Sequence, residues 1–371
     1  MNEKVSLRLA TENDLDDLVR LEEAAFTIDR FSEDQIDYFL TRSRATIFVL
    51  EHGSAMAGAA YLLWRKSHRA ARLYNIALHP TYQGRKYGER LLKECELEAG
   101  RRECRMMTLE VRQDNAGAIR FYEKHGFSVV GGLADYYEDG MAGLKMAKEL
   151  RQKVPRQLRL NIPYHPQGLE FTCGQACMMM ALKYFLPKTE LTRTLELNLW
   201  REATLIFMAS GFGGAEGYGL ALSAVRRGLT CRLIVSMDTT PMLRSVRTAQ
   251  KREVMRVVHN DMKRQAYKAG VTSAVFEYGI HEVTSALHRG LVPIAMVSTY
   301  RLTGDRVPHW VVVTGIDEKS VYIHDPDSDS YRRKKSRARH LRIDKAEFLR
   351  MSRYGKEVYR CLLLIGPSRG A

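Results

Sequence analysis

The sequence predicts an α+β protein with two domains. Three observations favour this class: the length of 371 residues, two stretches in which strand and helix patterns alternate, and a polar, basic segment between them. That segment, residues 148–159, is interrupted by Pro155, as is typical of a linker. We therefore place a first domain at 1–150, the linker at 151–160 and a second domain at 161–371.

The first domain has the pattern of a mixed sheet with flanking helices. Val5–Leu9 alternates like a strand, and Thr11–Asp14 has the sequence of a capping box ahead of a helix that extends to Ala25. The further elements expected are strands at 46–51, 56–64 and 72–78, a helix at 86–99, a strand at 106–112 and a helix at 115–125. Antiparallel strands followed by a strand–helix–strand unit are typical of an α+β fold.

The second domain opens at Ile162 with a different order of elements. We expect a helix that begins near Cys173, a helical region at 190–209, a glycine-rich loop at Gly211–Gly219, a basic helical segment at 243–270, and strands at 292–298, 309–316 and 320–324. The segment 332–342 is the densest in Lys and Arg. We interpret it as a solvated loop, with an anion- or peptide-binding patch as the alternative.

The composition limits the possible partners. A formal net charge of +15 favours an acidic partner such as an anionic surface, an acidic peptide, a phosphorylated cofactor or a nucleic acid, but no nucleic-acid recognition motif occurs. The N-terminus lacks a signal-peptide pattern, and no apolar run approaches the roughly 18–20 residues of a membrane span. We therefore expect a cytoplasmic protein with no membrane partner, and leave its oligomeric state open.

The six cysteines are expected to be thiols, because a reducing compartment disfavours disulfides. Cys173 and Cys177 are separated by three residues, but no second Cys/His pair with metal spacing lies nearby. The sequence therefore predicts no metal site.

A loop that suits a pyrophosphate follows the strand that ends at Leu78. A glycine-bearing loop at the start of a helix directs backbone N–H groups outward, and the helix dipole adds partial positive charge. The residues of this phosphate loop are Gln83, Gly84, Arg85, Lys86, Tyr87 and Gly88. By itself such a loop is also compatible with an ordinary strand-to-helix turn.

A second motif lies downstream, and the two together resemble a known superfamily. Its residues are Leu109–Arg112, Asn115, Ala118, Phe121, Tyr122, Gly126 and Phe127. With the phosphate loop, this arrangement resembles the GCN5-related N-acetyltransferase (GNAT) superfamily over roughly residues 6–148. It is most similar to the branch that acetylates protein N-termini, such as the ribosomal-protein alanine acetyltransferases.

The resemblance implies an acetyl-CoA-dependent enzyme with specific residue roles. Backbone groups of Ile76 and Leu78 would hold the pantetheine arm, and Asn115 would hydrogen-bond the cofactor. Glu110 would act as general base for the attacking amine through water, and Tyr122 would protonate the departing thiolate. Alternatively, Glu110 is a surface charge at a strand end and Tyr122 is an aromatic residue packed on its helix.

Lys86 departs from the family pattern, because the family loop usually has glycine there. A side chain at this position can crowd the approach of the phosphate, although the backbone N–H is retained and a cation can favour binding. The departure bears on cofactor affinity more than on the fold.

The second domain carries the residues of a cysteine hydrolase. A cysteine at a helix start has its thiolate favoured by the dipole, a histidine can take the thiol proton, and a carboxylate can fix the histidine tautomer. A glutamine shortly before the cysteine can donate to the oxyanion. The candidates in chain order are Gln167, Cys173, His309 and Asp325, which is the order of papain-like folds.

These residues resemble the cysteine peptidases that remove double-glycine leaders from bacteriocin precursors. The resemblance covers roughly 160–350 and leaves an insertion at about 237–275 unexplained. It implies a papain-like fold with Cys173 as nucleophile. Cys177, one helical turn on, is the alternative nucleophile, and the alternatives to His309 are His165 and His324.

We therefore predict a bifunctional enzyme, an N-acetyltransferase joined to a cysteine peptidase, that acts on a peptide or protein substrate. In an alternative hypothesis, the peptidase-like domain has lost its activity and only binds a peptide or protein. A third hypothesis assigns the basic segments 243–270 and 332–342 to nucleic-acid contacts.

Overall fold

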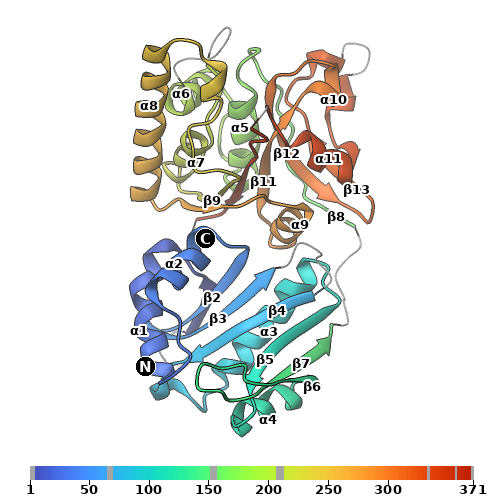
Figure 1. The fold of residues 1–371 in the computed structure, drawn as a ribbon. Coiled ribbons are helices and arrows are strands. Elements are labelled where there is room, and N and C mark those ends of the chain that lie inside the picture. Colours follow the sequence, from blue (N-terminus) through green and yellow to red (C-terminus); the bar gives the residue numbers. More distant parts are fainter. Residues whose placement is uncertain are drawn as a thin grey trace. The chain divides into compact units, whose positions relative to one another are not determined.

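The computed structural model describes residues 5–64, 70–150, 157–205, 213–331, 335–355 and 357–368. The chain divides into two compact units, Met1–Val154 and Pro155–Ala371, whose elements are labelled in Figure 1. The predicted linker extends too far, because Leu158–Arg159 form the short strand β8 and pair with the sheet of the second unit. Residues 151–156 of that linker lie outside the described residues.

The first unit contains a seven-stranded sheet in the order β1-β2-β3-β4-β5-β7-β6. Strands β4 and β5 are parallel and every other neighbouring pair is antiparallel, which confirms the predicted mixed sheet. The strands are β1 (Val5–Leu9), β2 (Ala45–His52), β3 (Ala55–Trp64), β4 (Ala70–Leu78), β5 (Met106–Arg112), β6 (Ser128–Leu133) and β7 (Gly143–Glu149).

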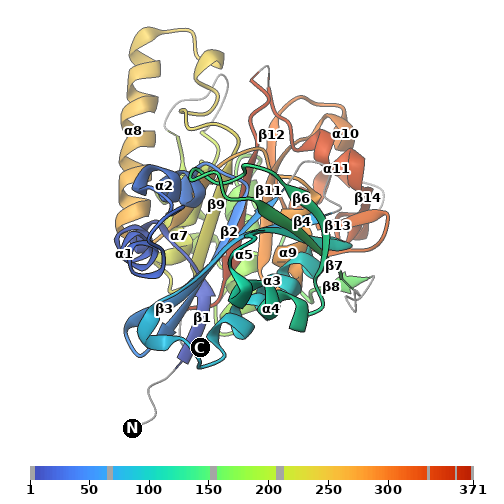
Figure 2. The same cartoon turned by 60° about the horizontal axis from the view of Figure 1, so that its bottom comes forward.

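Helices cover both faces of this sheet (Figure 2). A hydrophobic core lies on each face of the sheet, and successive residues of β2 point into one or the other. Ile47 and Val49 pack with α1 and α2, whereas Phe48 and Leu50 pack with α3. The helical elements are η1 (Glu12–Asp14), α1 (Leu15–Ala25), α2 (Glu33–Thr41), η2 (Pro80–Tyr82), α3 (Tyr87–Arg101) and α4 (Ala116–Lys124). The predicted capping box at the start of η1 and α1 is confirmed.

Strands β4 and β5 separate after three residue pairs. Their register ends where Arg72 lies opposite Thr108, so the rest of β4 has no parallel partner on that side. A β-bulge at Tyr74 occurs just beyond this point, because Tyr61 pairs with Asn75 whereas Leu62 pairs with Leu73. The sheet therefore contains a gap beside the second half of β4.

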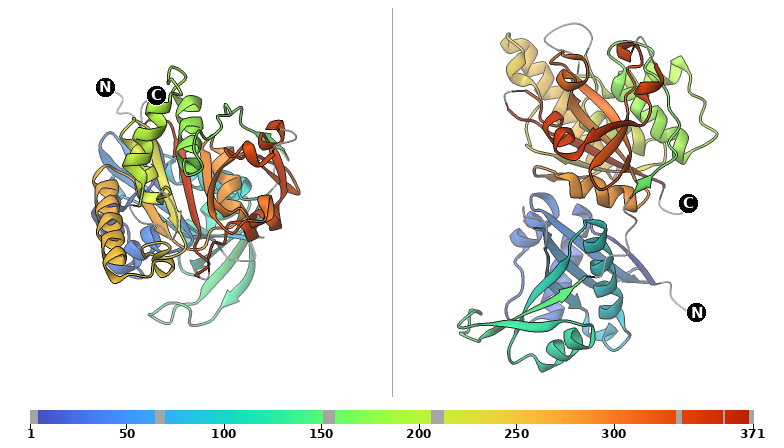
Figure 3. Two further views of the ribbon diagram at one scale, coloured as in Figure 1. Left: turned by 90° about the horizontal axis from the view of Figure 1, so that it is seen from above. Right: turned by 90° about the vertical axis from the view of Figure 1, so that its right-hand side faces the viewer.

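The second unit contains an eight-stranded sheet with β8 at the side of β12. Its path is β10-β9-β15-β11-β12-β13-β14, and β15, the dark red strand of Figure 3, lies in its interior between β9 and β11. The strands are β9 (Thr230–Val235), β10 (Thr272–Val275), β11 (Val292–Ser298), β12 (Pro308–Ile316), β13 (Ser320–His324), β14 (Leu341–Asp344) and β15 (Cys361–Gly366).

The helices of the second unit differ in their burial. Helix α5 is buried from Cys173 to Leu182, whereas α8 stands at one edge of the unit and buries only four side chains. The helices are α5 (Cys173–Phe185), α6 (Arg193–Ala203), α7 (Gly217–Val225), α8 (Ala249–Lys268), α9 (Ile280–His288), α10 (Tyr300–Thr303) and α11 (Lys345–Met351). Short 3-10 turns are η3 (Leu243–Ser245), η4 (Asp329–Tyr331) and η5 (Lys335–Ala338).

Two of the predicted loops are wrong in part. Gly217 and Gly219 begin α7, where packing requires small residues: a Cβ would lie 2.7 Å from Cys361 Sγ at the first position and 2.6 Å from Ala203 Cα at the second. The basic segment 332–342 ends in η5 and the start of β14. Residues 206–212 and 332–334 lie outside the described residues.

The six cysteines are all free and buried. No helix in the described ranges is both long enough and apolar enough to cross a membrane. Within those same ranges, no group of three or more His, Cys, Asp or Glu side chains could hold a metal ion.

Candidate functional site

The candidate catalytic residues of the second unit come from three elements that meet in its core. Cys173 is the first residue of α5, His309 lies at the start of β12, and Asp325 follows the end of β13. Helix α5 packs against β12, and β13 pairs with β12. The fold therefore brings together three residues that are up to 152 positions apart in the sequence.

The side chains of Asp325 and His309 are in direct contact, and the thiol lies close to the imidazole. His309 Nε2 lies 2.7 Å from Asp325 Oδ1, and the Cys173 thiol lies near enough to the ring to affect its pKa. Because Nε2 faces the carboxylate, Nδ1 is the nitrogen left for the thiol. Asp325 accepts two further hydrogen bonds, from the Asp327 N–H at 2.9 Å and the Tyr331 hydroxyl at 2.9 Å.

Neighbouring charges outweigh burial and favour a protonated imidazole at His309. Burial alone would lower the pKa of His309, but the charges of Asp325 and Cys173 and its hydrogen bonds to both raise that pKa well above its usual value. Burial would raise the pKa of Asp325, but the His309 charge and three hydrogen-bond donors around the carboxylate keep it below its usual value. The arrangement suits an imidazolium that has taken the proton of the Cys173 thiol and is stabilised by the Asp325 carboxylate.

The alternative nucleophile and bases are less suitable. Cys177 is fully buried, and burial raises its thiol pKa well above its usual value. His324 accepts a hydrogen bond from the His340 N–H at 3.0 Å and lies 3.0 Å from the Ile162 carbonyl, and burial lowers its pKa to about 4. Burial also lowers the pKa of His165.

Gln167 lies in the loop that leads into α5. Its Nε2 donates to the Glu170 carbonyl at 3.4 Å, which is a long hydrogen bond, and its Oε1 is buried with no partner in the described part of the chain. The amide is therefore weakly tethered, and its backbone is fixed by a bond from its N–H to the Pro326 carbonyl at 2.9 Å.

In the first unit, the predicted cofactor residues surround the gap between β4 and β5. Ile76 and Leu78 lie on β4 beyond the last pair with β5, and the phosphate loop leads into α3. Lys86 has φ = 62° and Gly84 has φ = 76°, both in the left-handed region that favours glycine. This conformation gives a physical reason for the glycine that the family usually has at the position of Lys86.

Asn115 is the N-cap of α4, and Tyr122 lies on that helix. The Asn115 Oδ1 accepts a hydrogen bond from the Ala118 N–H at 3.0 Å and so caps the helix, which leaves its amide Nδ2 as a donor. Tyr122 packs against Phe127, and burial raises its pKa. Tyr122 is consequently a protonated hydroxyl at neutral pH.

Glu110 is held on the opposite face of the sheet, toward α1 and α2. Its Oε2 accepts a hydrogen bond from Arg72 Nε at 2.7 Å, and Arg72 also donates to the Tyr136 hydroxyl at 3.1 Å. Glu110 and Tyr122 are therefore not in contact; the gap separates them. The hydrogen bond from Arg72 fixes the direction of the Glu110 carboxylate.

Sequence reasoning missed several residues beside this gap. Burial and neighbouring groups, Tyr136 and Asp29 among them, raise the pKa of Tyr137 to about 12, and Glu110 and Tyr122 both lie within electrostatic range of its hydroxyl. The adjacent tyrosines Tyr136 and Tyr137 in an otherwise acidic segment were the available signal. Their proximity to Glu110 depends on strand register and could not be predicted from the sequence.

Glu22 is a second residue that the sequence did not single out. It lies on α1, is 1% exposed, and accepts hydrogen bonds from Asn75 Nδ2 at 2.7 Å and from the Phe31 N–H at 3.4 Å. Burial raises its pKa to about 7. It joins α1, the loop after α1 and the bulged part of β4.

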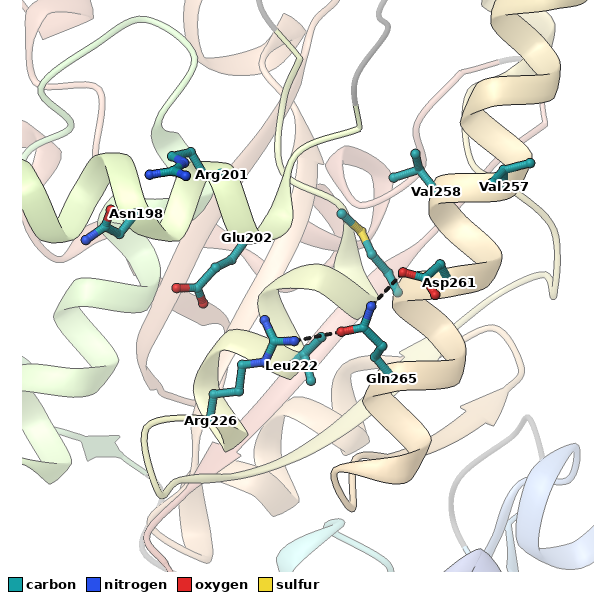
Figure 4. Close-up of a pocket in the computed structure, with 10 residues that line it drawn as sticks. Asn198, Arg201, Glu202, Leu222, Arg226, Val257, Val258, Asp261 and Gln265 are labelled. Carbon is teal, nitrogen blue, oxygen red and sulfur yellow. Dashed lines mark hydrogen bonds between the residues drawn. The ribbon is translucent and has the colours of Figure 1, made fainter.

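A groove of about 620 Å³ opens between α6, α7 and α8 (Figure 4). Its polar groups are partly paired with one another, since Arg226 donates to Gln265 at 2.7 Å and Gln265 donates to Asp261 at 2.6 Å. None of the candidate catalytic residues lines it. The lining residues are Asn198, Arg201, Glu202, Leu222, Arg226, Val257, Val258, Asp261, Met262 and Gln265.

Comparison with family models divides the chain in the same way. The model of the Peptidase_C39 like family matches residues 162–366, and the model of the Acetyltransferase (GNAT) family matches residues 15–127. The first match covers more than half of the chain. The second covers strands β2 to β5 and helices α1 to α4, which include the strands on both sides of the gap.

Curated relatives match the first unit. A protein of Bacillus subtilis, named as a candidate ribosomal protein bS18 alanine N-acetyltransferase, is 28% identical over 139 residues, which are 38% of this chain and 91% of that protein. The ribosomal protein bS18 alanine N-acetyltransferase of Haemophilus influenzae is 36% identical over 77 residues, or 21% of this chain and about half (52%) of that protein. A crystal structure of the corresponding Escherichia coli enzyme is 28% identical, with a TM-score of 0.38, and the match covers 41% of this chain and 97% of that one.

Proposed function

The chain belongs to the Peptidase_C39 like family and carries a GNAT acetyltransferase domain, and on this premise we propose that it is a bifunctional enzyme acting on peptides or proteins. Its first activity is acetyl transfer from acetyl-CoA to an amine, and its second is peptide cleavage by a cysteine nucleophile. The observation that carries the second activity is the 2.7 Å contact of His309 with Asp325, close to the Cys173 thiol at the start of α5. We extend the proposal to a papain-like fold, since α5 presents the cysteine beside the strand that carries the histidine.

In the peptidase reaction, Cys173 gives its thiol proton to His309 and its sulfur attacks the scissile carbonyl carbon. The oxyanion is held by the Gln167 amide and by the backbone N–H of Cys173 at the start of α5. The imidazolium then donates its proton to the departing amine, and water hydrolyses the thioester. Asp325 keeps the imidazole oriented throughout and stabilises its charge.

In the acetyl transfer, the protein supplies binding groups and a proton path. The phosphate loop and the first turn of α3 offer N–H groups to a pyrophosphate, and the backbone of β4 near Ile76 and Leu78, beyond the last pair with β5, suits the amides of a pantetheine arm. Bound acetyl-CoA supplies the activated acetyl group. Glu110 takes the proton of the acceptor amine through water, and Tyr122 gives its proton to the leaving thiolate.

The ribosomal protein acetyltransferases among the relatives support a protein N-terminus as the acceptor. Peptide cleavage exposes a new α-amine, which is the group that such an enzyme acetylates. We therefore propose that one peptide or protein substrate serves both sites.

The test is mass spectrometry of a peptide library incubated with the purified full chain, with and without acetyl-CoA. New fragments that appear without cofactor support the peptidase, and products heavier by one acetyl group that require the cofactor support the acetyltransferase. Absence of acetyl-CoA binding by calorimetry at millimolar cofactor would contradict the first activity.

A parallel measurement separates cleavage from peptide binding alone. A His309-paired Cys173 should react with iodoacetamide at neutral pH much faster than the buried Cys231 does. Equal alkylation rates would favour a second unit that binds peptides without cutting them.

A further inference from the structure

The loop 164–172 carries Gln167 and leads into α5. One side of this loop is fixed to the turn that follows β13, because the Gln167 N–H donates to the Pro326 carbonyl at 2.9 Å. The Tyr164 hydroxyl donates to the Asp325 carbonyl at 3.0 Å. The backbone around Gln167 is thus tied to the turn that also presents the candidate catalytic carboxylate.

The other side of the loop is fixed by Glu196, which lies on α6 and is 2% exposed. A single carboxylate oxygen, Oε1, accepts hydrogen bonds from the Gly168 N–H at 2.7 Å and the Thr172 hydroxyl at 2.5 Å. Gly168 is the residue after Gln167, and Thr172 is the residue before Cys173. One oxygen atom therefore joins the flanks of the two residues that must cooperate in catalysis.

The second oxygen of this carboxylate is also engaged. Glu196 Oε2 accepts a hydrogen bond from Arg193 Nη1 at 2.8 Å, one turn earlier on α6. The pair lies so close to Gly168 that a Cβ there would be 1.5 Å from Arg193 Nη1 and 2.6 Å from Glu196 Oε2. The close approach of the loop to α6 thus depends on a glycine at position 168.

We call the hydrogen bonds of Glu196 to Gly168 and Thr172 the clamp. They fix the backbone beside Gln167 but not the side chain of Gln167. The backbone is bonded on both sides of the residue, whereas the side-chain amide has one long hydrogen bond and a buried, unpartnered oxygen within the described ranges. A donor of this kind can turn toward an oxyanion without any backbone movement.

We propose that Glu196 is a positioning residue for peptide cleavage, which sets the separation between the Gln167 amide and the Cys173 thiol. The inference rests on the proposed peptidase function. Glu196 acts through its hydrogen bonds to Gly168 and Thr172 and does not contact the reacting atoms. It should therefore affect stabilisation of the oxyanion while leaving the activation of the thiol by His309 unchanged.

The test compares Glu196→Ala, Glu196→Gln and Glu202→Ala in the full chain. The control residue lies on the same helix and loses a comparable ion pair, with Arg227 at 2.8 Å, that does not touch the loop. For each variant, kcat, KM, the affinity for a peptide aldehyde and the rate of Cys173 alkylation are measured. A peptide aldehyde forms a tetrahedral adduct with the thiol and so reports on the oxyanion donors.

We expect Glu196→Ala to lower kcat and aldehyde affinity by about tenfold or more, with an alkylation rate within about twofold of the native protein. Glu196→Gln should recover most of the loss, because its amide oxygen can still accept both hydrogen bonds. The inference is wrong if Glu196→Ala matches Glu202→Ala, or if alkylation and thermal stability fall in parallel with cleavage.

A different outcome would separate this inference from the proposed function. If the native chain neither cuts peptides nor binds aldehydes, the peptidase function fails. Amide hydrogen exchange then decides on the clamp: faster exchange of residues 168–172 in Glu196→Ala than in Glu202→Ala supports it, and equal exchange overturns it.

Discussion

The candidate site of the second unit consists of side chains that contact one another, whereas that of the first unit is a gap between two strands. His309 is hydrogen-bonded to Asp325 and lies close to Cys173 within the protein itself. In the first unit, Glu110 is paired with Arg72 on one face of the sheet, and Tyr122 lies on a helix that covers the other. No direct contact between candidate catalytic groups exists there.

The difference follows from the origin of the reacting groups. A cysteine peptidase carries its own nucleophile, so the fold must place an activating base and an orienting carboxylate beside it. In acetyl transfer, both the amine and the thioester arrive with substrates. The fold then needs an opening in which the two substrates meet, backbone groups that bind the cofactor and a proton donor placed beside the leaving thiolate. Four predictions test this comparison, from the largest expected effect to the smallest.

Replacement of the nucleophile should have the largest effect. Cys173→Ala should lower the rate of peptide cleavage by about 10³-fold or more, because no other thiol lies beside His309 in a comparable position. The measurement is fragment formation by mass spectrometry, with acetyl transfer by the same preparation as an internal reference. Cys177→Ala is the matched control and should keep its cleavage activity; loss of cleavage in this control alone would reverse the assignment.

The pH dependence of stability should reveal the buried carboxyl of the first unit. Glu22 has a folded pKa of about 7 against an ordinary value of 4.5, so between these values the folded chain holds a proton that the unfolded chain releases. Stability should therefore fall as pH rises through this window, by about 3 kcal/mol in all. Glu22→Gln stays uncharged and should remove this fall.

The measurement for Glu22 is amide hydrogen exchange of α1 and β4 from pH 4 to pH 8, about the range that brackets the shift. Glu23→Gln, an exposed neighbour, is the control and should keep the native pH profile. An unchanged profile in Glu22→Gln would mean that other groups cause the dependence. The result bears on the comparison of the two units because Glu22 is a carboxyl group of the first unit that has a structural role and no catalytic one.

Removal of the proposed proton donor should slow acetyl transfer and spare cofactor binding. Tyr122→Phe should reduce kcat by about 10²-fold, since burial keeps this hydroxyl protonated and thus able to donate. The dissociation constant of acetyl-CoA, measured by calorimetry, should change little. Tyr38→Phe, at an exposed position on α2, serves as the control; equal kcat values in the two variants would remove Tyr122 from the mechanism.

The smallest effect is expected at Lys86. A left-handed φ costs a non-glycine residue about 1 kcal/mol, so Lys86→Gly should stabilise the loop by up to that amount and leave the affinity for acetyl-CoA within about threefold. Lys86→Ala removes the charge and keeps the strain. Should Lys86→Gly and Lys86→Ala both lose affinity about tenfold or more, the cation rather than the backbone binds the phosphate.

Apolar runs and alternation in the sequence were sufficient for much of the first sheet. Strands β2 and β3 are apolar runs, β5 alternates, and α3 and α4 follow glycine- and asparagine-bearing starts; the predicted ranges of β2 to β5, α3 and α4 agree with the structure to within two residues. Helix α2 was not predicted, although its capping box of Ser32 and Gln35 was visible. Strand β15 was not predicted either, although Cys361–Gly366 is an apolar run of the kind that also forms β2.

The candidate sites were predictable to different degrees. Cys173, His309 and Asp325 could be selected from residue type, chain order and neighbouring motifs, and the fold brings them together. The pairing of Arg72 with Glu110 depends on the register of two strands, and the bonds of Glu196 to Gly168 and Thr172 depend on how α6 packs. Such partners leave no local pattern in the sequence.

The position of β15 has a consequence for how the chain folds during synthesis. Cys361–Gly366 lies between β9 and β11, and Ile365 pairs with Cys231, so the middle of this sheet stays open until those residues leave the ribosome. Every strand of the first unit is made earlier, and that unit can fold while translation continues. We expect nascent chains arrested before β15 to contain a folded first unit and an aggregation-prone second one, with two newly exposed strand edges.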